Sequence, residues 1–129
     1  MIGILVISHE PLGTALISCT RHIFGRLPSQ LAALDVIPDE DTTAASEAAT
    51  QLAARINDGS GVLVLTDIYG ATPSRIAAQL AEPYRCVVIS GASLPMLVKA
   101  INYRKGRDLE EIANLIMPAA KDAIMSITG

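Results

Sequence analysis

Aromatic residues are scarce in this chain. Its 129 residues include one Phe, three Tyr and no Trp, although half of all residues are hydrophobic. The core must therefore consist of Ala, Leu, Ile and Val, which favours Ala-rich helices packed closely on an aliphatic sheet. Cysteine is scarce too. Cys19 and Cys86 match no metal-ligand spacing, so we expect two buried thiols in a reducing compartment and no disulfide framework.

An excess of basic charge is also lacking. The formal net charge is -3 and the isoelectric point is about 5.2, whereas a nucleic-acid-binding face needs clustered basic residues. Nucleic acid is therefore not an expected partner. Basic residues bunch at Arg104, Lys105 and Arg107. We interpret this cluster as a solvated loop, with a docking surface for an acidic partner as the alternative.

No apolar run approaches the roughly 18 residues that a membrane helix needs. The apolar segment 1–7 has no basic residue before it and no small-residue cleavage site after it, so it does not resemble a signal peptide. We expect a cytoplasmic protein without direct membrane insertion. The length predicts one domain, residues 1–129, large enough for a three-layer fold. No internal repeat, low-complexity segment or linker is evident.

Four mostly apolar segments lack the alternation of a half-exposed strand, which is typical of parallel strands covered on both faces. They are residues 2–8, 31–37, 61–66 and 84–91, and the second is the weakest. Between and after them, apolar residues recur at helical spacing. The predicted buried helical faces are Leu12, Ala15, Leu16, Cys19 and Ile23; Ala45, Ala48, Ala49, Leu52, Ala53 and Ile56; Ile76, Ala77 and Leu80; Leu97, Val98 and Ile101; and Leu109, Ile112, Ala113 and Ile116.

The helix ends have recognisable signals. Gly25 is a plausible stop for the first helix, Thr42 and Thr43 can cap the second, and Ser93 precedes the fourth. Asp108 with Glu111 predicts a capping box for the last helix. Pro118 should break or kink that helix because proline removes an internal hydrogen bond. Residues 119–129 are then either a final short helix or an edge strand.

Strands that alternate with helices imply a parallel sheet with right-handed crossovers. We therefore predict an α/β fold, a doubly wound three-layer sandwich with strand order 2-1-3-4. In that order strands 1 and 3 are neighbours and the topological switch lies between them. Ligands of such folds bind outside the carboxyl ends of the strands, so polar residues at those ends are the candidates for function.

The third strand ends at such a polar residue, Asp67. Gly70 then allows a turn, and Thr72 with Pro73 predicts an N-cap and the first position of a new helix. A helix N-terminus that opens into the mouth of the sheet suits an anion such as phosphate. The alternative interpretation is that Asp67 is only a turn residue.

The first strand ends at His9, 58 residues before Asp67. A carboxylate beside an imidazole can fix one ring nitrogen as N–H, leave the other as a nucleophile and stabilise positive charge on the ring. Thr72 and the backbone N–H groups of Gly70 and Ala71 would then receive the oxygens of a phosphoryl group. No metal-ligand cluster surrounds His9, and His22 is expected at the surface. The alternative is that a backbone group merely satisfies His9.

Three motifs in this order resemble a known family, the mannose-type IIA components of the bacterial phosphoenolpyruvate-dependent sugar phosphotransferase system. The motifs are a first strand that ends in His (residues 7–9), the segment VLTDIYGATP at residues 64–73, and the segment GASLPML at residues 91–97. The second is similar to the family's acid-x-x-Gly-x-Ser/Thr-Pro segment and the third to its Gly-x-x-x-Pro-Met-Leu helix start. The likeness covers nearly the whole chain.

The resemblance implies a phosphotransferase component with a phosphohistidine intermediate and no cofactor. His9 would accept a phosphoryl group from the phosphocarrier HPr, with Asp67 as its orienting partner, and pass it to a IIB component or another acceptor. The resemblance also implies a homodimer, in which a C-terminal antiparallel strand of one subunit can complete the other's sheet, and a peripheral association with a membrane permease. The alternative is that the phosphoryl group on His9 serves as a regulatory signal.

Glu10 departs from the family pattern, which commonly has Gly after the histidine. A negative charge there should disfavour the phosphorylated form or narrow the choice of partner. Two other classes of function stay open. One is a module like a response-regulator receiver, phosphorylated on Asp67, although the residues after the first strand supply only one acid. The other is a regulatory domain that binds a partner in the same crevice without turnover.

Overall fold

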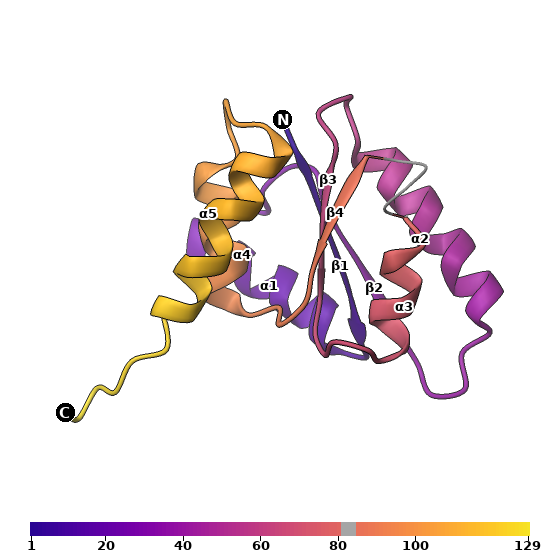
Figure 1. The fold of residues 1–129 in the computed structure, drawn as a ribbon, viewed down its shortest axis with the longest axis horizontal. Helices are drawn as coiled ribbons and strands as arrows, with labels where there is room; N and C mark the ends of the chain where they lie inside the picture. Colours follow the sequence, from indigo (N-terminus) through magenta and orange to yellow (C-terminus); the bar gives the residue numbers. More distant parts are fainter. Residues whose placement is uncertain (81–84) are drawn as a thin grey trace.

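The computed structural model describes residues 1–80 and 85–129, and their strands form one parallel sheet of order β2-β1-β3-β4 (Figure 1). The predicted α/β fold and strand order are thus confirmed. In chain order the elements are β1 (Gly3–His9), α1 (Leu12–Phe24), β2 (Leu31–Val36), α2 (Thr42–Ile56), β3 (Val62–Thr66), α3 (Thr72–Ala78), β4 (Cys86–Ile89), α4 (Leu94–Tyr103) and α5 (Leu109–Asp122). The predicted start of the fourth strand at Tyr84 lies outside the described residues.

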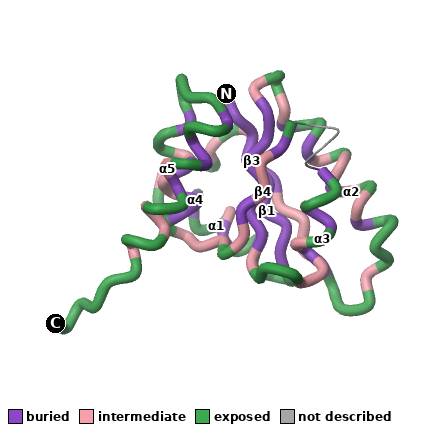
Figure 2. Tube along the Cα trace, in the orientation of Figure 1, coloured by how far each residue is buried: buried purple, intermediate pink, exposed green. Residues whose placement is uncertain are grey.

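The sheet is the middle layer of a sandwich, with α2 and α3 on one face and α1, α4 and α5 on the other (Figure 1). The central strands β1 and β3 are buried along nearly their whole length (Figure 2). Successive side chains serve opposite faces: Ile4 and Val6 join the cluster with α4 and α5, whereas Leu5 and Ile7 join the cluster with α2 and α3. This explains the continuous apolar pattern, since neither face is left for water.

Small residues let the helices pack closely on the sheet. Ala45, Ala49 and Ala53 of α2 are at most 2% exposed and share a core cluster with Leu5 and Ile7 of β1. The predicted faces of α3 and α5 are buried as well. Their buried members are Ile76 and Ala77 of α3, with Leu80 just after it, and Leu109, Ile112, Ala113 and Ile116 of α5. An Ala, Leu, Ile and Val core is therefore confirmed.

The predicted face of α1 is wrong. Its buried residues are Gly13, Leu16 and Thr20, and of the predicted stripe only Leu16 is among them. Cys19 is exposed, contrary to the expected buried thiol, whereas Cys86 is buried. The physical reason is a close approach of α1 to β1 and β2 at Gly13, which turns the smaller residues inward.

Most helix ends follow the sequence signals. Gly25 adopts a left-handed conformation after α1, Ser93 caps α4, and Asp108 and Glu111 form the predicted capping box. The N-cap of α2 differs, because the side chain of Asp41 accepts the N–H groups of Thr43 and Ala44 at 2.9 and 3.3 Å. The predicted caps Thr42 and Thr43 are instead the first two residues of the helix.

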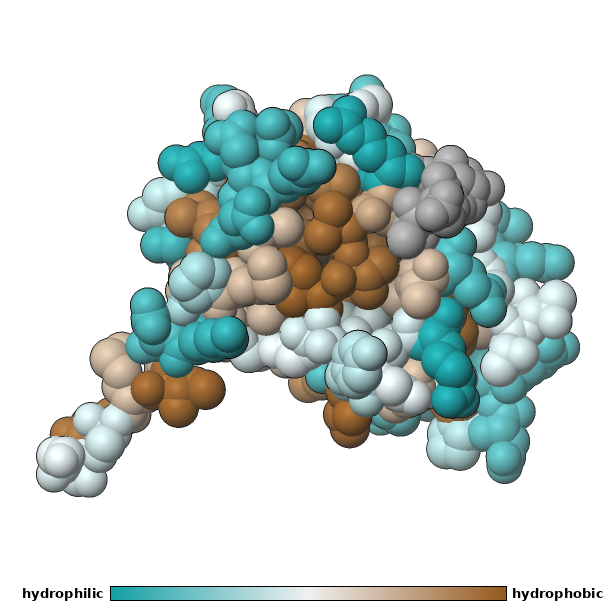
Figure 3. All heavy atoms as spheres, viewed as in Figure 1, coloured by the Kyte–Doolittle hydropathy of each residue, from teal (hydrophilic) through white to brown (hydrophobic). Residues whose placement is uncertain are grey.

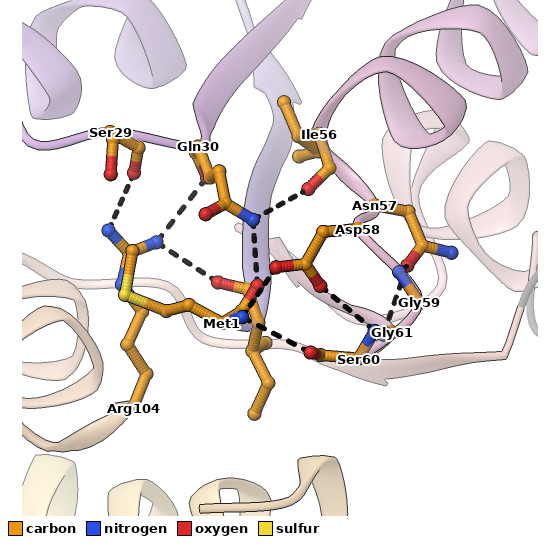
Figure 4. A network of polar contacts seen from close by, with 11 residues as sticks. Met1, Ser29, Gln30, Ile56, Asn57, Asp58, Gly59, Ser60, Gly61 and Arg104 are labelled. Carbon is orange, nitrogen blue, oxygen red and sulfur yellow. Dashed lines mark hydrogen bonds and ion pairs between the residues drawn. The ribbon is translucent and has the colours of Figure 1, made fainter. Parts of the chain in front are cut away.

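Arg104 lies in the interior and not in a solvated loop, which corrects the interpretation of the basic cluster; Lys105 and Arg107 are exposed. Its guanidinium donates to the carbonyl oxygens of Ile2 at 3.1 Å, Ser29 at 2.6 Å and Gln30 at 3.4 Å (Figure 4). Burial lowers the pKa of Arg104 from its ordinary value. This side chain joins the amino-terminal ends of β1 and β2, away from the carboxyl ends where a functional site is expected.

Pro118 does not end α5, which continues to Asp122. Within a helix, proline frees the carbonyl four residues earlier. That carbonyl belongs to Asn114, an exposed residue, so water can satisfy it. Of residues 119–129, expected as a short helix or an edge strand, 119–122 are the end of α5, whereas 123–129 form neither helix nor strand. Ile124, Met125 and Ile127 are 87%, 75% and 98% exposed. Among the described residues, no helix is long and apolar enough to cross a membrane.

Candidate functional site

His9 and Asp67 meet at the carboxyl end of the sheet. His9 is the last residue of β1, Asp67 directly follows β3, and the two strands are neighbours with Ile7 opposite Thr66. The His9 Nδ1 lies 2.7 Å from Asp67 Oδ2, and the His9 backbone N–H donates to the same oxygen at 2.9 Å. The predicted meeting of these two residues is confirmed. One carboxylate oxygen thus holds both the ring and the main chain of the histidine.

Asp67 is itself fixed from two sides. Its other oxygen, Oδ1, accepts the backbone N–H of Ile68 at 2.9 Å. Its carbonyl oxygen accepts the N–H of Gly91 at 2.9 Å, and the carbonyl of Thr66 accepts the N–H of Ala92 at 2.8 Å. The segment after β4 therefore anchors the main chain of Asp67. The Asp67 side chain is restricted as well, because both of its oxygens accept hydrogen bonds.

The electrostatics of Asp67 favour its ionised form. Burial alone would raise its pKa, but the hydrogen bonds from the His9 backbone, the His9 ring and the Ile68 backbone outweigh burial, so the pKa lies below its ordinary value of 3.8. A carboxylate is an acceptor only. The His9 Nδ1 must therefore carry the proton of this contact, which leaves the lone pair of the neutral ring on Nε2.

The ring of His9 is accessible. Its side chain is 50% exposed, whereas that of Asp67 is 10% exposed. An imidazole whose Nδ1–H is held by a mostly buried carboxylate and whose side chain is half exposed is suited to nucleophilic attack, because the carboxylate stabilises the positive charge that develops on the ring. The arrangement can therefore form a covalent bond at Nε2 with an electrophile from outside.

A hollow of about 490 Å³ opens beside His9. It is lined by His9, Glu10, Val36, Ile37, Pro38, Asp39, Glu40, Thr42 and Thr72. Three of these residues, Glu10, Asp39 and Glu40, are acidic. Their negative charge repels an anion that enters the hollow. Water and salt weaken this repulsion because the hollow is open to solvent.

The turn between Asp67 and α3 has the predicted glycine. Gly70 adopts a φ of +82°, a left-handed conformation that favours glycine over other residues. The predicted N-cap is wrong. Ala71 occupies the N-cap position, and Thr72 is the first residue of α3. The Ala71 N–H donates to the carbonyl of Ile68 at 3.3 Å, so it already has a partner. Of the three predicted phosphate-binding residues, only Thr72 lines the hollow with His9.

Arg75 contacts this turn and was missed by sequence reasoning. Its guanidinium donates to the carbonyl of Gly70 at 3.3 Å and to the Thr72 hydroxyl oxygen at 3.1 Å. A hydroxyl that accepts from a cation keeps its own proton available for another acceptor. The only signal in the sequence is helical spacing, since residues three apart lie on one face of a helix.

Asp35 was missed as well. It lies in β2, where its carboxylate accepts the backbone N–H and the hydroxyl of Thr14 at 3.1 and 2.6 Å. A signal was present, because an aspartate interrupts an otherwise apolar strand segment. His22, expected at the surface, is exposed. Within residues 1–80 and 85–129, no group of three or more His, Cys, Asp or Glu side chains is placed to hold a metal ion.

The chain is similar to several known proteins. Residues 3–117 match the family model described as the PTS system fructose IIA component. The chain is 30% identical over 115 residues to the PTS system fructose-specific EIIA component of Bacillus subtilis, a match that covers 88% of this chain and 78% of that protein. It is also 35% identical over 72 residues to YadI of Escherichia coli, a protein named as a phosphotransferase enzyme IIA component. That match covers 55% of this chain and about half, 49%, of YadI.

The fold has close counterparts among solved structures. The crystal structure of the phosphotransferase system component EIIA from Streptococcus agalactiae superimposes with a TM-score of 0.89. The superposition covers 99% of this chain and 98% of that one, at 22% sequence identity. At this identity the likeness shows a shared fold.

Proposed function

The chain belongs to the family of PTS system fructose IIA components, and from this premise we propose that residues 1–129 act as one phosphocarrier domain in the cytoplasm. His9 accepts a phosphoryl group from phospho-HPr and passes it to a IIB-type acceptor, or the phosphorylated form serves as a regulatory signal. The observation that carries the proposal is the contact of 2.7 Å between His9 Nδ1 and Asp67 Oδ2.

The proposed step is an in-line exchange between two histidines. The lone pair of His9 Nε2 attacks phosphorus, the bond from phosphorus to the donor nitrogen breaks, and the donor ring keeps that electron pair. His9 then carries a proton on Nδ1 and phosphorus on Nε2, so its ring is cationic. Asp67 stabilises this cation by charge and by a charge-assisted hydrogen bond. Transfer to the acceptor is the same step in reverse.

The turn at residues 70–72 is proposed to receive the phosphoryl oxygens. Thr72 lines the same hollow as His9, and its hydroxyl oxygen accepts from Arg75. Its hydroxyl proton can then be donated to a phosphoryl oxygen. Gly70 and Ala71 contribute backbone groups, and the Ala71 N–H would first have to leave the carbonyl of Ile68. Donors placed where charge accumulates are a major source of rate in such transfers.

The direct test is phosphorylation by purified donors. The chain is incubated with labelled phosphoenolpyruvate, enzyme I and HPr, and the product is digested and mapped. We expect one label on His9 that is lost in acid and absent from His9→Gln. His22→Gln is the matched control, because it removes the other, exposed histidine and should retain the label. A His9→Gln protein that is still labelled would exclude the proposed acceptor.

Two other classes of function give different outcomes in this experiment. A receiver-like module would carry an acyl phosphate on Asp67, which hydroxylamine cleaves. Its geometry is less suitable here, because both carboxylate oxygens already accept hydrogen bonds. A regulatory domain without turnover would bind its partner and take no label at all.

We also propose that the chain forms a homodimer through β4. This strand is an edge of the sheet, and a groove of about 540 Å³ runs beside it between α4 and α5. Figure 3 shows apolar atoms gathered at the centre of the view over β4. The apolar tail after α5 is exposed in the single chain. A tail from a second copy that paired with β4 would satisfy the strand edge and cover the groove.

Light scattering tests this arrangement. We expect the wild-type chain to be a dimer and Met125→Asp with Ile127→Asp to be a monomer, because two charges on the exposed tail would enter an apolar groove. Lys121→Asp is not a suitable control, since Lys121 lines the groove. Glu110→Lys on the first turn of α5 changes charge away from it. A dimer that survives both tail substitutions would show that the tail does not form the interface.

A peripheral association with a membrane permease is proposed from family membership alone.

A further inference from the structure

The start of α1 is held by a side chain from another element. Pro11 occupies its N-cap position and makes no side-chain hydrogen bond to the helix. Asp35 of β2 takes that role: Oδ1 accepts the backbone N–H of Thr14 at 3.1 Å, and Oδ2 accepts the Thr14 hydroxyl at 2.6 Å. Thr14 is the third residue of α1. A carboxylate at this place satisfies an N–H group without an intrahelical partner and complements the positive end of the helix.

The contact depends on a close approach of α1 to the sheet. A Cβ on Gly13 would lie 2.8 Å from Asp35 Oδ1 and 2.9 Å from Ser8 Oγ. Ser8 and Asp35 are opposite each other in β1 and β2. Ser8 is fully buried, and its hydroxyl has no hydrogen-bond partner. Helix α1 therefore packs against β1 and β2 next to His9, and no residue larger than glycine fits at position 13.

Only two residues, Glu10 and Pro11, connect His9 with α1; β2 holds the first of them, and the first turn of α1 holds the second. The Glu10 N–H donates to the carbonyl of Val36 at 3.0 Å, and the Ala15 N–H donates to the carbonyl of Pro11 at 3.0 Å. Val36 directly follows Asp35. The main chain from His9 to Thr14 is thus tied to two adjacent residues of β2, one through a carbonyl and one through a carboxylate.

Resting on the phosphocarrier function proposed above, we propose that Asp35 is a positioning residue for phosphoryl transfer. By holding the first turn of α1 against β1 and β2, its carboxylate fixes the main chain that leaves His9. The His9 backbone N–H and ring Nδ1 can then reach the same oxygen of Asp67. Asp35 does not touch the reacting nitrogen and acts through Thr14 and the connection at residues 10–11.

Loss of the Asp35 carboxylate would disturb the orientation of His9. Without Asp35, the N–H and hydroxyl of Thr14 lose their acceptor, and the first turn of α1 has no side-chain cap. The first turn of α1 can then fray, and residues 10–11, which connect it to His9, can move with it. An in-line transfer is sensitive to such displacement, since a misplacement of about 1 Å can reduce a rate by about 10²-fold.

The test compares two helix caps of the same type. Asp35→Ala removes the cap of α1, and Asp108→Ala removes the N-cap of α5, which accepts the Glu111 N–H at 2.9 Å. Asp108 precedes Leu109, which packs at Gly61 near the amino-terminal end of β3, so it lies far from His9. Both variants should melt at a lower temperature than the wild-type chain. Only Asp35→Ala should slow transfer from phospho-HPr, by about tenfold or more, with the larger effect on kcat and not on KM.

A second readout does not depend on transfer. In the free protein, the ¹⁵N signals of the His9 ring report the Nδ1–H form that Asp67 holds. We expect these signals to shift or broaden in Asp35→Ala and to remain as in the wild-type chain in Asp108→Ala. Thr14→Val, which removes only the hydroxyl, should change them in the same direction but less, and Thr14→Ser should restore them. If Asp35→Ala folds too poorly, Thr14→Val is the variant compared with Asp108→Ala.

The outcomes separate the two proposals. If the wild-type chain takes no phosphoryl group, the proposed function fails, and the His9 signals still decide whether Asp35 orients that ring. If the wild-type chain is phosphorylated but Asp35→Ala transfers at the wild-type rate, or keeps wild-type His9 signals, Asp35 is a structural cap only and the inference is overturned.

Discussion

A single oxygen of Asp67, Oδ2, accepts both the backbone N–H of His9 at 2.9 Å and the ring Nδ1 of the same residue at 2.7 Å. The carboxylate therefore fixes the position of the histidine as well as its tautomer. Any substitution at Asp67 must change both properties, and this coupling makes the site sensitive to replacements that preserve shape.

Asp67→Asn should keep the fold and slow phosphoryl transfer. A neutral amide stabilises the cationic ring less well than a carboxylate, and in either orientation its NH2 group meets a backbone N–H, that of His9 or that of Ile68. A comparable exchange in a serine protease triad costs about 10⁴-fold, and we expect roughly 10²-fold or more here. Single-turnover transfer from phospho-HPr measures the effect. Asp41→Asn, which alters the cap of α2, is the control, and an Asp67→Asn protein that transfers at the wild-type rate would contradict the assigned pairing.

The lowered pKa of Asp67 predicts a pH-dependent contribution to stability. Because the folded pKa lies below the ordinary value of 3.8, the contribution is fully present above 3.8 and is lost as the pH falls below 3.8 through the folded value. Asn cannot titrate. The difference in free energy of unfolding between wild type and Asp67→Asn should therefore shrink between about pH 5 and about pH 3. Urea unfolding at the two pH values measures it, and a constant difference would show that the carboxylate gains nothing from its partners.

Glu10→Gln should increase the fraction of the chain that is phosphorylated at equilibrium with the donor. The substitution removes a negative charge from the hollow beside His9, where a phosphoryl group would add more negative charge. Both groups are exposed, so we expect only a few-fold effect that decreases with salt. Glu110→Gln makes the same change of charge on α5 and is the control. An identical response of the two variants would indicate a general effect of net charge.

Thr72→Val should slow transfer while leaving donor affinity nearly unchanged, because the hydroxyl is proposed to act on the transferring phosphoryl group. Loss of one such donor in other enzymes costs about 10²–10³-fold in kcat. Thr72→Ser should recover most of the rate. Arg75→Ala should show a smaller decrease, since it leaves the hydroxyl in place but removes its partner at 3.1 Å. Rate measurements over a range of phospho-HPr concentrations separate kcat from KM, and an effect on KM alone would place Thr72 in partner binding.

Arg104→Met should lower stability without altering transfer by the folded protein. It leaves the carbonyls of Ile2, Ser29 and Gln30 without this donor, at a cost of about 2–4 kcal/mol in the free energy of unfolding. The residue lies at the amino-terminal end of the sheet, opposite His9. Chemical denaturation and single-turnover transfer together test the claim. A stable Arg104→Met protein would show that water replaces the guanidinium at these carbonyls.

Much of the fold followed from local patterns. Continuous apolar segments that end in His9 and Asp67 predicted two central strands with polar residues at the same edge of the sheet, and the alternation of strands and helices gave the order 2-1-3-4. The meeting of His9 and Asp67 was a consequence of that order. Capping signals such as Ser93 and the pair Asp108 and Glu111 were also reliable, because each depends on residues only three apart.

The misses concern contacts between distant residues or competition between neighbours. Asp41 caps α2 in place of Thr42 or Thr43 because several polar residues stand together at that helix start, and Thr72 begins α3 one position after the N-cap Ala71; spacing alone does not select the capping residue. The face of α1 was misjudged because Gly13 carries no side chain and so contributes nothing to an apolar pattern. Yet its lack of a Cβ is what lets the helix approach Ser8 and Asp35.

By itself, the sequence determined which segments are strands, which residues end them and hence which two side chains can meet, because the period of apolar residues records burial on one face or on two. The tertiary structure alone decided the contacts around it: one carboxylate oxygen for two donors of His9, Asp35 as a cap supplied from β2 and, at the opposite end of the sheet, Arg104 inside the fold. Each of these is a contact between groups whose separation and direction depend on how the layers pack, and no local pattern of residues contains that information.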